Sequence, residues 1–501
     1  LGAVQAGLLR SAEVKWVRWP GGEIADRFDP AALNWSGLIY ATDGVPTLPA
    51  SNTSQFVAWC KSISCQAIIT VPAEVDEPSL ASDYASYLEQ TLDFFPAYWE
   101  IGNEPADWSH FGVPWDSWTG EQNITPTPEQ YADVVNSYTV AIHSVDPEAR
   151  IIGLGGVGAG VATEGEWINA TMAVNGANLS AVAVHVYPAG NSYANESAAQ
   201  VFATLNGPAA LSQRIPKDRG DVAEDCSNCA VTIVADELGV GTEAPFAGFA
   251  TGFGVIPFLA AEYVQGLTLN VTNLDYFTLQ LNAPTALLGS TGAVQPVANL
   301  FTDFLPELPE AIDGSHVNES GNGLYALAGV SENGSTDPTI LLVNTNTSVA
   351  YAVNLTASGF PSRTYVESVT WNSSGPSPIT QYLNQPFPLN VVVPPQGLGL
   401  WRSESGVPFS VSRLGPPLEP KERIITNPTA ARASGPFVIP PPRDSAGERI
   451  YLTHVTGASS GRGRKISTPA RMQRRALIVD TGPREGIPGS FGRCGTSGAR
   501  R

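Results

Sequence analysis

Two glutamates each end a short apolar run of this sequence. Glu104 closes the run YWEIGNE and precedes Pro105, which cannot donate to a strand ladder, and Glu237 closes the run VTIVADE. Two carboxyl groups about 5–5.5 Å apart can cleave an acetal, because one protonates the leaving oxygen while the other attacks the anomeric carbon. We therefore predict that Glu104 is an acid/base and Glu237 a nucleophile. Asn103, directly before Glu104, supplies an amide that can bond a sugar hydroxyl.

Other polar residues can support this pair. Arg18 can keep the nucleophile ionised through a charge-assisted hydrogen bond. His185 and Tyr187 are two residues apart in the run HVYP, so both face the same side of a strand. The competing interpretation is that these are polar groups satisfied inside a core. Asp236 and Glu243 are rivals of Glu237 for the role of nucleophile.

The loop after Glu104 is rich in aromatic residues, among them Trp108, Phe111, Trp115 and Trp118. Aromatic rings can stack on the apolar faces of sugars, so we predict Trp108 as a substrate-binding residue. A loop of this composition can equally fix itself by its own hydrophobic cluster. The sequence leaves both interpretations open.

The elements that would position these residues alternate between apolar strands and helical segments. Seven apolar runs occur at 14–20, 66–72, 98–104, 150–156, 181–188, 231–239 and 274–280. Continuous apolar strands separated by helices predict a parallel sheet covered on both faces. We predict an α/β fold, a (β/α)8 TIM barrel over residues 1–305. Only seven strands are visible, so we expect the first strand to be missing upstream of Leu1.

The pattern changes after about residue 306. Short alternating strands separated by turn residues predict an antiparallel β-sandwich over residues 306–403. Residues 404–501 are rich in Arg, Gly, Pro and Ser and have almost no periodicity. We expect this basic, low-complexity tail to be disordered or not native.

The two glutamate motifs resemble those of clan A of the glycoside hydrolases, which are retaining (β/α)8 enzymes. There the Glu of Asn-Glu-Pro on the fourth strand is the acid/base, and a Glu on the seventh strand is the nucleophile. Counting 14–20 as the second strand puts Glu104 and Glu237 on those strands. The run VRWPGG resembles a turn of α-L-arabinofuranosidase-like members and is similar to one in heparanase and β-glucuronidase relatives. The resemblance also implies a Tyr at the sixth strand, here Tyr187, that hydrogen-bonds the nucleophile.

The charge distribution restricts the partners. The net charge is −20, and residues 1–401 carry 10 basic against 40 acidic side chains. Such a surface repels nucleic acid and anionic membranes and disfavours a polyanionic substrate. We therefore expect an oligo- or polysaccharide substrate and no nucleic-acid partner. We predict no cofactor and no metal, and the oligomeric state stays open.

Cysteines and glycosylation motifs favour an exported protein, secreted or on the cell surface. Twelve Asn-x-Ser/Thr motifs occur, which is dense for glycosylation sites. The close pairs Cys60/Cys65 and Cys226/Cys229 fit local disulfides, with free thiols or a zinc site as alternatives. We expect no membrane span, because the most apolar stretch, 246–261, is short and broken by glycine and proline.

Two competing interpretations complete the list. The run GLGGVG (153–158) satisfies a dinucleotide-binding pattern, but no acid ends the next strand to bind a ribose, so we attribute it to chance. A non-catalytic carbohydrate-binding surface protein on the same fold is the alternative function. A binding module does not need both carboxylates, which favours the enzyme.

Overall fold

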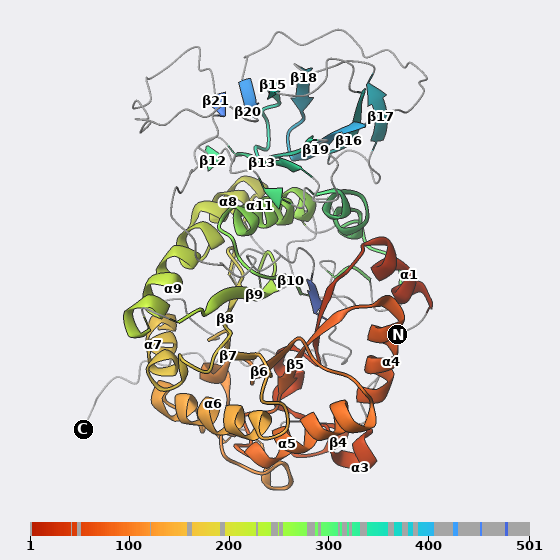
Figure 1. Ribbon diagram of the computed structural model, residues 1–501. Coiled ribbons are helices and arrows are strands. Elements are labelled where there is room, and N and C mark those ends of the chain that lie inside the picture. Colours follow the sequence, from red (N-terminus) through yellow and green to blue (C-terminus); the bar gives the residue numbers. More distant parts are fainter. Residues whose placement is uncertain are drawn as a thin grey trace, which may run out of the picture.

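The structure is a computed structural model. It describes most of residues 3–404, with its longer gaps at 158–162, 191–195, 242–248, 250–253, 278–285, 313–317, 331–337, 359–364, 373–378 and 384–388. Beyond residue 404 it describes 424–428, 451–452 and 476–478. A ring of strands and helices makes up one half of the molecule, and β-strands gather in the other half (Figure 1).

Seven parallel strands form the barrel wall, and they fall on the seven apolar runs. In spatial order they are β1 (Trp16–Trp19), β5 (Gln66–Val71), β6 (Tyr98–Ile101), β7 (Ile151–Gly155), β8 (Ala181–Val186), β9 (Thr232–Leu238) and β10 (Leu274–Tyr276). The parallel strands and their order confirm the prediction of a TIM-type barrel.

The eighth position of the barrel is occupied by a segment of the tail. The three-residue strand β22 (Ala476–Ile478) pairs in parallel with β1 on one side and β10 on the other. We expected a gap at this place, where the first strand of a complete barrel would lie. Residues 476–478 fill it, while most of the tail lies outside the described residues.

Helices surround the barrel, and local sequence explains where they begin. The side chain of Asn52 caps α4 (Thr53–Ile63), and Thr127 and Gln130 form a capping box at α6 (Pro128–His143). The other main helices are α1 (Ala3–Ser11), α5 (Pro78–Ser86), α7 (Glu164–Asn175), α8 (Ala198–Ala203), α9 (Leu211–Asp225) and α11 (Val255–Thr268). Residues on all sides of α11 are buried, so the part of the apolar stretch 246–261 that lies in α11 belongs to a core helix.

The inside of the barrel is divided into an apolar end and a charged end. Trp16, Ile68, Tyr98 and Val234 belong to one buried cluster at the start of the strands. Two residues later on the same strands stand Arg18, Thr70, Glu100 and Asp236, all completely buried. Because side chains alternate with period two along a strand, both sets face inward. The polar set therefore lies toward the carboxyl ends, where barrel enzymes have their active sites.

The strands after residue 305 form two further sheets. One has the order β11 (Ala311–Ile312), β13 (Leu324–Val330), β14 (Pro338–Asn344), β19 (Gly397–Glu404), β16 (Tyr365–Asn372) and β17 (Ile379–Leu383), with β12 (Asn318–Glu319) beside β13. The other has the order β18 (Leu389–Val393), β15 (Tyr351–Ser358), β20 (Ile424–Pro428) and β21 (Tyr451–Leu452). Buried residues of both sheets share one hydrophobic cluster. Pro394 and Pro395, which lack the N–H that a strand ladder needs, separate β18 from β19.

Both close cysteine pairs form disulfides. Cys60 is bonded to Cys65 between α4 and β5, and Cys226 to Cys229 between α9 and β9. The bonds lie before strands, at the end of the barrel opposite the polar cluster. This arrangement excludes the zinc alternative for these two pairs.

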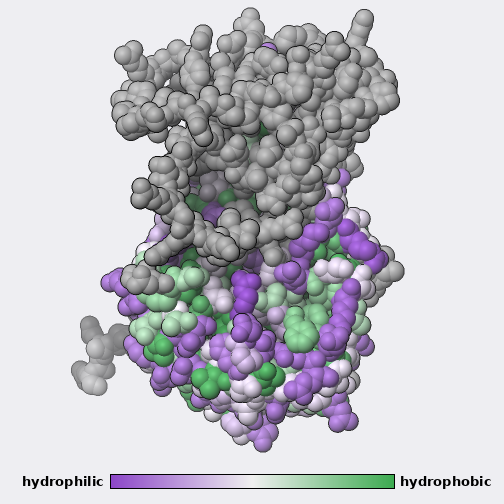
Figure 2. Space-filling view, in the orientation of Figure 1, coloured by the Kyte–Doolittle hydropathy of each residue, from purple (hydrophilic) through white to green (hydrophobic). Residues whose placement is uncertain are grey.

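The described surface of the barrel mixes polar residues with isolated apolar ones (Figure 2). Among the described residues, no helix combines the length and the apolar character that crossing a bilayer requires. The expectation that 246–261 does not span a membrane agrees with this finding for its described part.

A buried ion cluster ties two outer helices to the barrel. Arg214 on α9 binds Glu164 at the start of α7 and also donates to the backbone carbonyl of His185 on β8. Asp218, one turn after Arg214, is buried, and neither of its oxygens accepts a hydrogen bond from the described residues. Burial and the nearby Glu164 carboxylate raise the pKa of Asp218 to about 7.

The raised pKa of Asp218 predicts a pH-dependent cost in stability. An unfolded chain ionises this group near pH 4, so the folded protein holds a proton that the unfolded one releases as pH rises from about 4 to 7. We expect Asp218→Asn, which stays neutral, to raise the free energy of unfolding at pH 8 by roughly 2 kcal/mol and to change it little at pH 4. Urea unfolding at the two pH values measures this, with Glu224→Gln on the exposed side of α9 as control. Equal effects of Asp218→Asn at both pH values would contradict the assignment.

Candidate active site

Arg18 is the centre of the polar cluster. Its Nε and Nη2 donate to the two oxygens of Glu100 at 2.6 and 2.8 Å, and Nη2 also donates to Oδ1 of Asn103 at 2.9 Å. Nη1 donates to Oε2 of Glu237 at 3.1 Å. Thr70 donates a further hydrogen bond to Glu100 at 2.7 Å. A planar guanidinium thus binds strand β6 with one edge and strand β9 with the other.

Glu104 lies just past β6, where the chain turns away from the barrel wall. Gly102 and Glu104 both have positive φ, at 72° and 42°, and a short 3-10 turn follows from Pro105. The backbone N–H of Glu104 donates to the carbonyl of Gly155 at 2.9 Å, which ties this turn to β7. The Glu104 side chain keeps 24% of its surface exposed, so it can meet a substrate.

Glu237 lies on β9, opposite His185 of β8. Its Oε2 accepts from Arg18, and its Oε1 accepts a short hydrogen bond from the Tyr187 hydroxyl. Only 8% of the Glu237 side chain is exposed. Both oxygens of Glu237 therefore accept hydrogen bonds from the described residues.

The two rivals of Glu237 differ in position. Asp236 is completely buried below Glu237, and the pairing of β9 shifts register at this level with both neighbouring strands. A register shift re-aims side chains, and here both Asp236 and Glu237 lie near Arg18. Glu243 lies outside the described residues.

His185 bridges the two predicted catalytic carboxylates. Its Nδ1 is 2.8 Å from Oε1 of Glu104 and 3.6 Å from Oε2 of Glu237. These two oxygens are therefore no farther apart than the sum of the two distances, so the two carboxylates lie on the same side of the site. Burial alone lowers the pKa of His185, but the carboxylates of Glu237 and Glu104 outweigh it and raise that pKa.

The glycine run 153–158 has a packing function at this site. A Cβ on Gly155 would meet the Gly102 carbonyl oxygen at 2.4 Å and Oε1 of Glu100 at 2.5 Å. A Cβ on Gly156, whose φ is +68°, would meet the His185 ring at 2.5 Å. The end of β7 therefore needs glycine because the Glu100 carboxylate and the imidazole occupy the space.

Trp108 does not form an exposed platform. It is 4% exposed, its indole N–H donates to the Asn103 carbonyl at 2.7 Å, and its ring stacks on Phe111. Trp115 and Trp118 are also buried, and Trp118 stacks on His110. This packing favours the interpretation in which the loop fixes itself, and Trp108 then acts by holding Asn103.

Two more acids lie beside the acid/base loop. Asp26 accepts from the backbone N–H of Asn103 at 3.0 Å, and Glu74 accepts from the backbone N–H groups of Ser109 and His110. Burial raises the pKa of both acids. The nearby Glu74 carboxylate raises the pKa of Asp26 further. These acids fix the backbone on both sides of Glu104.

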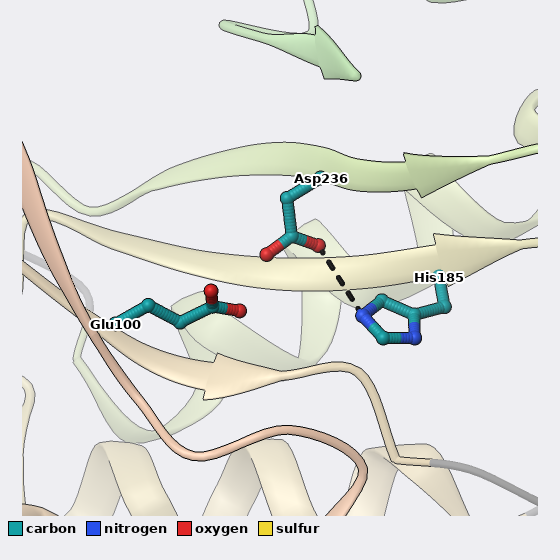
Figure 3. A group of neighbouring side chains, drawn as sticks. All are labelled: Glu100, His185 and Asp236. Carbon is teal, nitrogen blue, oxygen red and sulfur yellow. Dashed lines mark ion pairs between the residues drawn. The ribbon is translucent and has the colours of Figure 1, made fainter. Parts of the chain in front are cut away.

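One group of side chains has the composition of a metal site. Ligand atoms of Glu100, His185 and Asp236 lie within 4.8 Å of one another (Figure 3). Arg18, however, already binds both Glu100 oxygens, and its Nε is 3.6 Å from Oδ2 of Asp236. A divalent cation would meet this guanidinium at close range, so the charges already present fit a metal poorly.

Sequence reasoning missed Glu100 and Asp275 deeper in the barrel, and it considered Asp236 only as a rival of Glu237. Glu100, Asp236 and Asp275 are completely buried within strands β6, β9 and β10. The available signal was an acid in the middle of an apolar strand, which is costly unless it has a partner. Their grouping around Arg18 depends on strand register, which the sequence does not reveal.

Comparisons with known proteins identify the fold. No protein-family model and no curated protein matches the sequence. The α-L-arabinofuranosidase of Thermotoga maritima is 14% identical with a TM-score of 0.63, covering 79% of this chain and 89% of that one. The GH51 arabinofuranosidase from Xanthomonas axonopodis pv. citri is 17% identical with a TM-score of 0.60, covering 80% and 89%. A Paenibacillus polymyxa xyloglucanase from GH family 44 is 12% identical with a TM-score of 0.56, covering 79% and 94%.

At these identities the likeness is one of fold. The chain shares its barrel fold with these arabinofuranosidases and this xyloglucanase, and no single family is distinguished.

The packing at Gly156 generates a prediction. Gly156→Ala should push the His185 ring away from Glu104 and lower kcat/KM about 10- to 100-fold, because small displacements of catalytic groups are costly. Gly153→Ala is the matched control, since its Cβ would meet only the Leu179 side chain, at 2.5 Å. We expect both variants to melt at lower temperature and only Gly156→Ala to move the pH dependence of kcat/KM. If the two variants had the same pH profile, His185 would not depend on this glycine.

Proposed function

We propose that this protein is a retaining glycoside hydrolase that uses Glu104 as acid/base and Glu237 as nucleophile. The observation that carries the proposal is that both carboxylates lie near His185 Nδ1, at 2.8 and 3.6 Å, and that Arg18 and Tyr187 donate hydrogen bonds to Glu237. This asymmetry separates the two roles. Glu237 receives the donors that stabilise an anion, whereas Glu104 is more exposed toward a leaving group.

The reaction follows in two steps. Glu237 attacks the anomeric carbon while Glu104 gives its proton to the leaving oxygen, so the glycosidic bond breaks as an ester forms. Glu104, now ionised, then takes a proton from water, which attacks the ester and releases Glu237. Asn103, held by Arg18, is placed to bond a sugar hydroxyl next to the reacting carbon.

The charge of the active-site face favours an uncharged sugar. The sequence contains no Lys or Arg between Lys61 and Arg150, between Arg150 and Arg214, or between Arg219 and Arg363. These stretches include the loops after β5 to β10. In the loop after β1, Arg27 is paired with Glu23, and Arg18 is buried and fully engaged.

A uronic acid needs a compensating cation or several aligned donors, so this face suits a neutral glycoside. We therefore favour an arabinofuranosidase-like substrate over a glucuronide. The resemblance of VRWPGG to a turn in heparanase and β-glucuronidase relatives would favour the glucuronide. The neighbouring solved structures whose titles name arabinofuranosidases support the arabinofuranosidase-like substrate.

The second domain and the cellular location belong to the same proposal. Two sheets that share one cluster suit the predicted β-sandwich, an accessory domain beside the barrel. Two disulfides and twelve glycosylation motifs support export to an oxidising compartment. A non-catalytic carbohydrate-binding protein is the alternative function, and turnover distinguishes the two.

Turnover of aryl glycosides tests the roles of the two glutamates. We expect Glu237→Gln to lower kcat at least about a thousandfold for every substrate, because the nucleophile is lost. Glu104→Gln should cost about 10²- to 10⁴-fold on substrates that need protonation and far less on those with a strongly acidic leaving group. Glu166→Gln, exposed on α7, is the control. Wild-type turnover by Glu237→Gln would refute the assignment, and sugar binding without any turnover would favour the binding protein.

A panel of substrates tests the charge argument. Aryl α-L-arabinofuranoside and aryl β-D-xyloside are neutral, and aryl β-D-glucuronide carries one negative charge. We expect kcat/KM for the best neutral substrate to exceed that for the glucuronide at least about tenfold, with the gap narrowing as salt screens the acidic face. A preference for the glucuronide at low salt would overturn the choice of substrate while leaving the glutamate assignments intact.

A further inference from the structure

Asp236 is a buried acid that the reaction steps above do not use. It precedes the nucleophile on β9, and its side chain has no exposed surface. Among the described residues, neither of its oxygens accepts a hydrogen bond from a donor. An ionised carboxylate in such a place lacks what normally stabilises it.

The groups that face Asp236 come from four strands. Arg18 Nε on β1 is 3.6 Å from Oδ2, and His185 Nε2 on β8 is 3.6 Å from Oδ1, both beyond hydrogen-bond distance. The Glu100 carboxyl on β6 lies beside it (Figure 3). Asp275 on β10 adds a further buried acid. Glu237 follows it in the sequence. One guanidinium therefore faces four buried carboxyl groups, together with one imidazole.

Arg18 donates hydrogen bonds to some of these acids and not to others. It gives three hydrogen bonds to Glu100 and Glu237 and none to Asp236. Two ionised carboxylates already balance the guanidinium and leave one negative charge. A third ionised carboxylate in contact with Glu100 would be held by no donor, and it would compete with Glu237 for the same cation.

We propose that Asp236 is a neutral carboxylic acid whose hydroxyl donates a hydrogen bond to Glu100. This acid pair is a positioning element, because a neutral Asp236 does not compete with Glu237 for Arg18. The hydroxyl of Asp236 is then a donor with an acceptor, and Glu100 gains a fourth hydrogen bond besides those from Arg18 and Thr70. The proton stays on Asp236 throughout and does not enter the reaction.

The electrostatics agree with this geometry. Burial first, and then the Glu100 carboxylate, raises the pKa of Asp236 well above its ordinary value. Burial also raises the pKa of Glu100, but the Arg18 charge and the hydrogen bond from Asp236 outweigh it, so that the pKa of Glu100 is lowered. The pKa values of the two acids thus shift in opposite directions, so that one acid is protonated and the other ionised, as in other carboxyl pairs that share a proton.

The catalytic consequence rests on the proposed function. In the resting enzyme the ionised groups are Arg18, Glu100 and Glu237, with a sum of one negative charge. After the first step Glu237 is a neutral ester and Glu104 is ionised, so the sum is unchanged. The charge moves from one carboxylate to the other across His185, which contacts both. A neutral Asp236 therefore neither favours nor opposes this movement of negative charge.

Infrared difference spectroscopy of the whole chain tests the protonation without any substrate. We expect wild type minus Asp236→Asn to contain one protonated-carboxyl band at every pH between about 5 and 8. Glu100→Gln, which weakens the acceptor, should move that band to higher frequency. Asp275→Asn is the matched control: burial also raises the pKa of Asp275, so this variant should lose its own acid band and keep the band of Asp236. Absence of the acid band, or a band that titrates away in this range, overturns the proposal.

Kinetics test the positioning role. Asp236→Asn imitates a neutral acid, so both limbs of its pH profile of kcat/KM should keep the wild-type positions, whereas Asp236→Ala should lower kcat about tenfold or more by freeing Glu100. A shift of either limb by about one pH unit in Asp236→Asn would show an ionised group and overturn the proposal. If no glycoside is turned over, the proposed function fails and the infrared result still decides the protonation. If Asp236→Asn does not fold, the band shift in Glu100→Gln decides it.

Discussion

The buried guanidinium of Arg18 is the interaction on which the site depends. A charge with no exposed surface is costly unless it is paired, and Arg18 makes four hydrogen bonds, to Glu100, Asn103 and Glu237. These partners come from the fourth and the seventh strand positions of the barrel, on opposite sides of its interior. The same contacts that satisfy the cation therefore fix the distance between strand β6, which leads to the proposed acid/base, and strand β9, which carries the proposed nucleophile.

Much of this arrangement could be predicted from the sequence. Seven apolar runs became the seven strands, and the two glutamates fell at strand ends because a barrel collects its polar side chains there. The pairing of Tyr187 with Glu237 followed from the resemblance, and His185 from period-two alternation. These inferences worked because each depended on a position along one strand.

The remaining features depend on neighbouring strands, and the sequence could not reveal them. Glu100, Asp236 and Asp275 become a cluster only through register, which includes shifts at β9. The burial of Trp108 depends on how its loop folds back over Gly102 and Phe111. The tail strand β22 could not be foreseen because three residues carry no periodicity. Composition gave no information about where a segment of the tail would pair.

The glycines at the end of β7 restrict how an enzyme of this kind can diversify. Gly155 and Gly156 admit no side chain without displacing Glu100 or His185, and the loop after β6 is occupied by its own stacked aromatic rings. Two of the barrel's loops are thus committed to holding the reactive groups. Changes in sugar preference would have to arise mainly outside these two segments. Selection on specificity and selection on chemistry would then act on different segments of the chain.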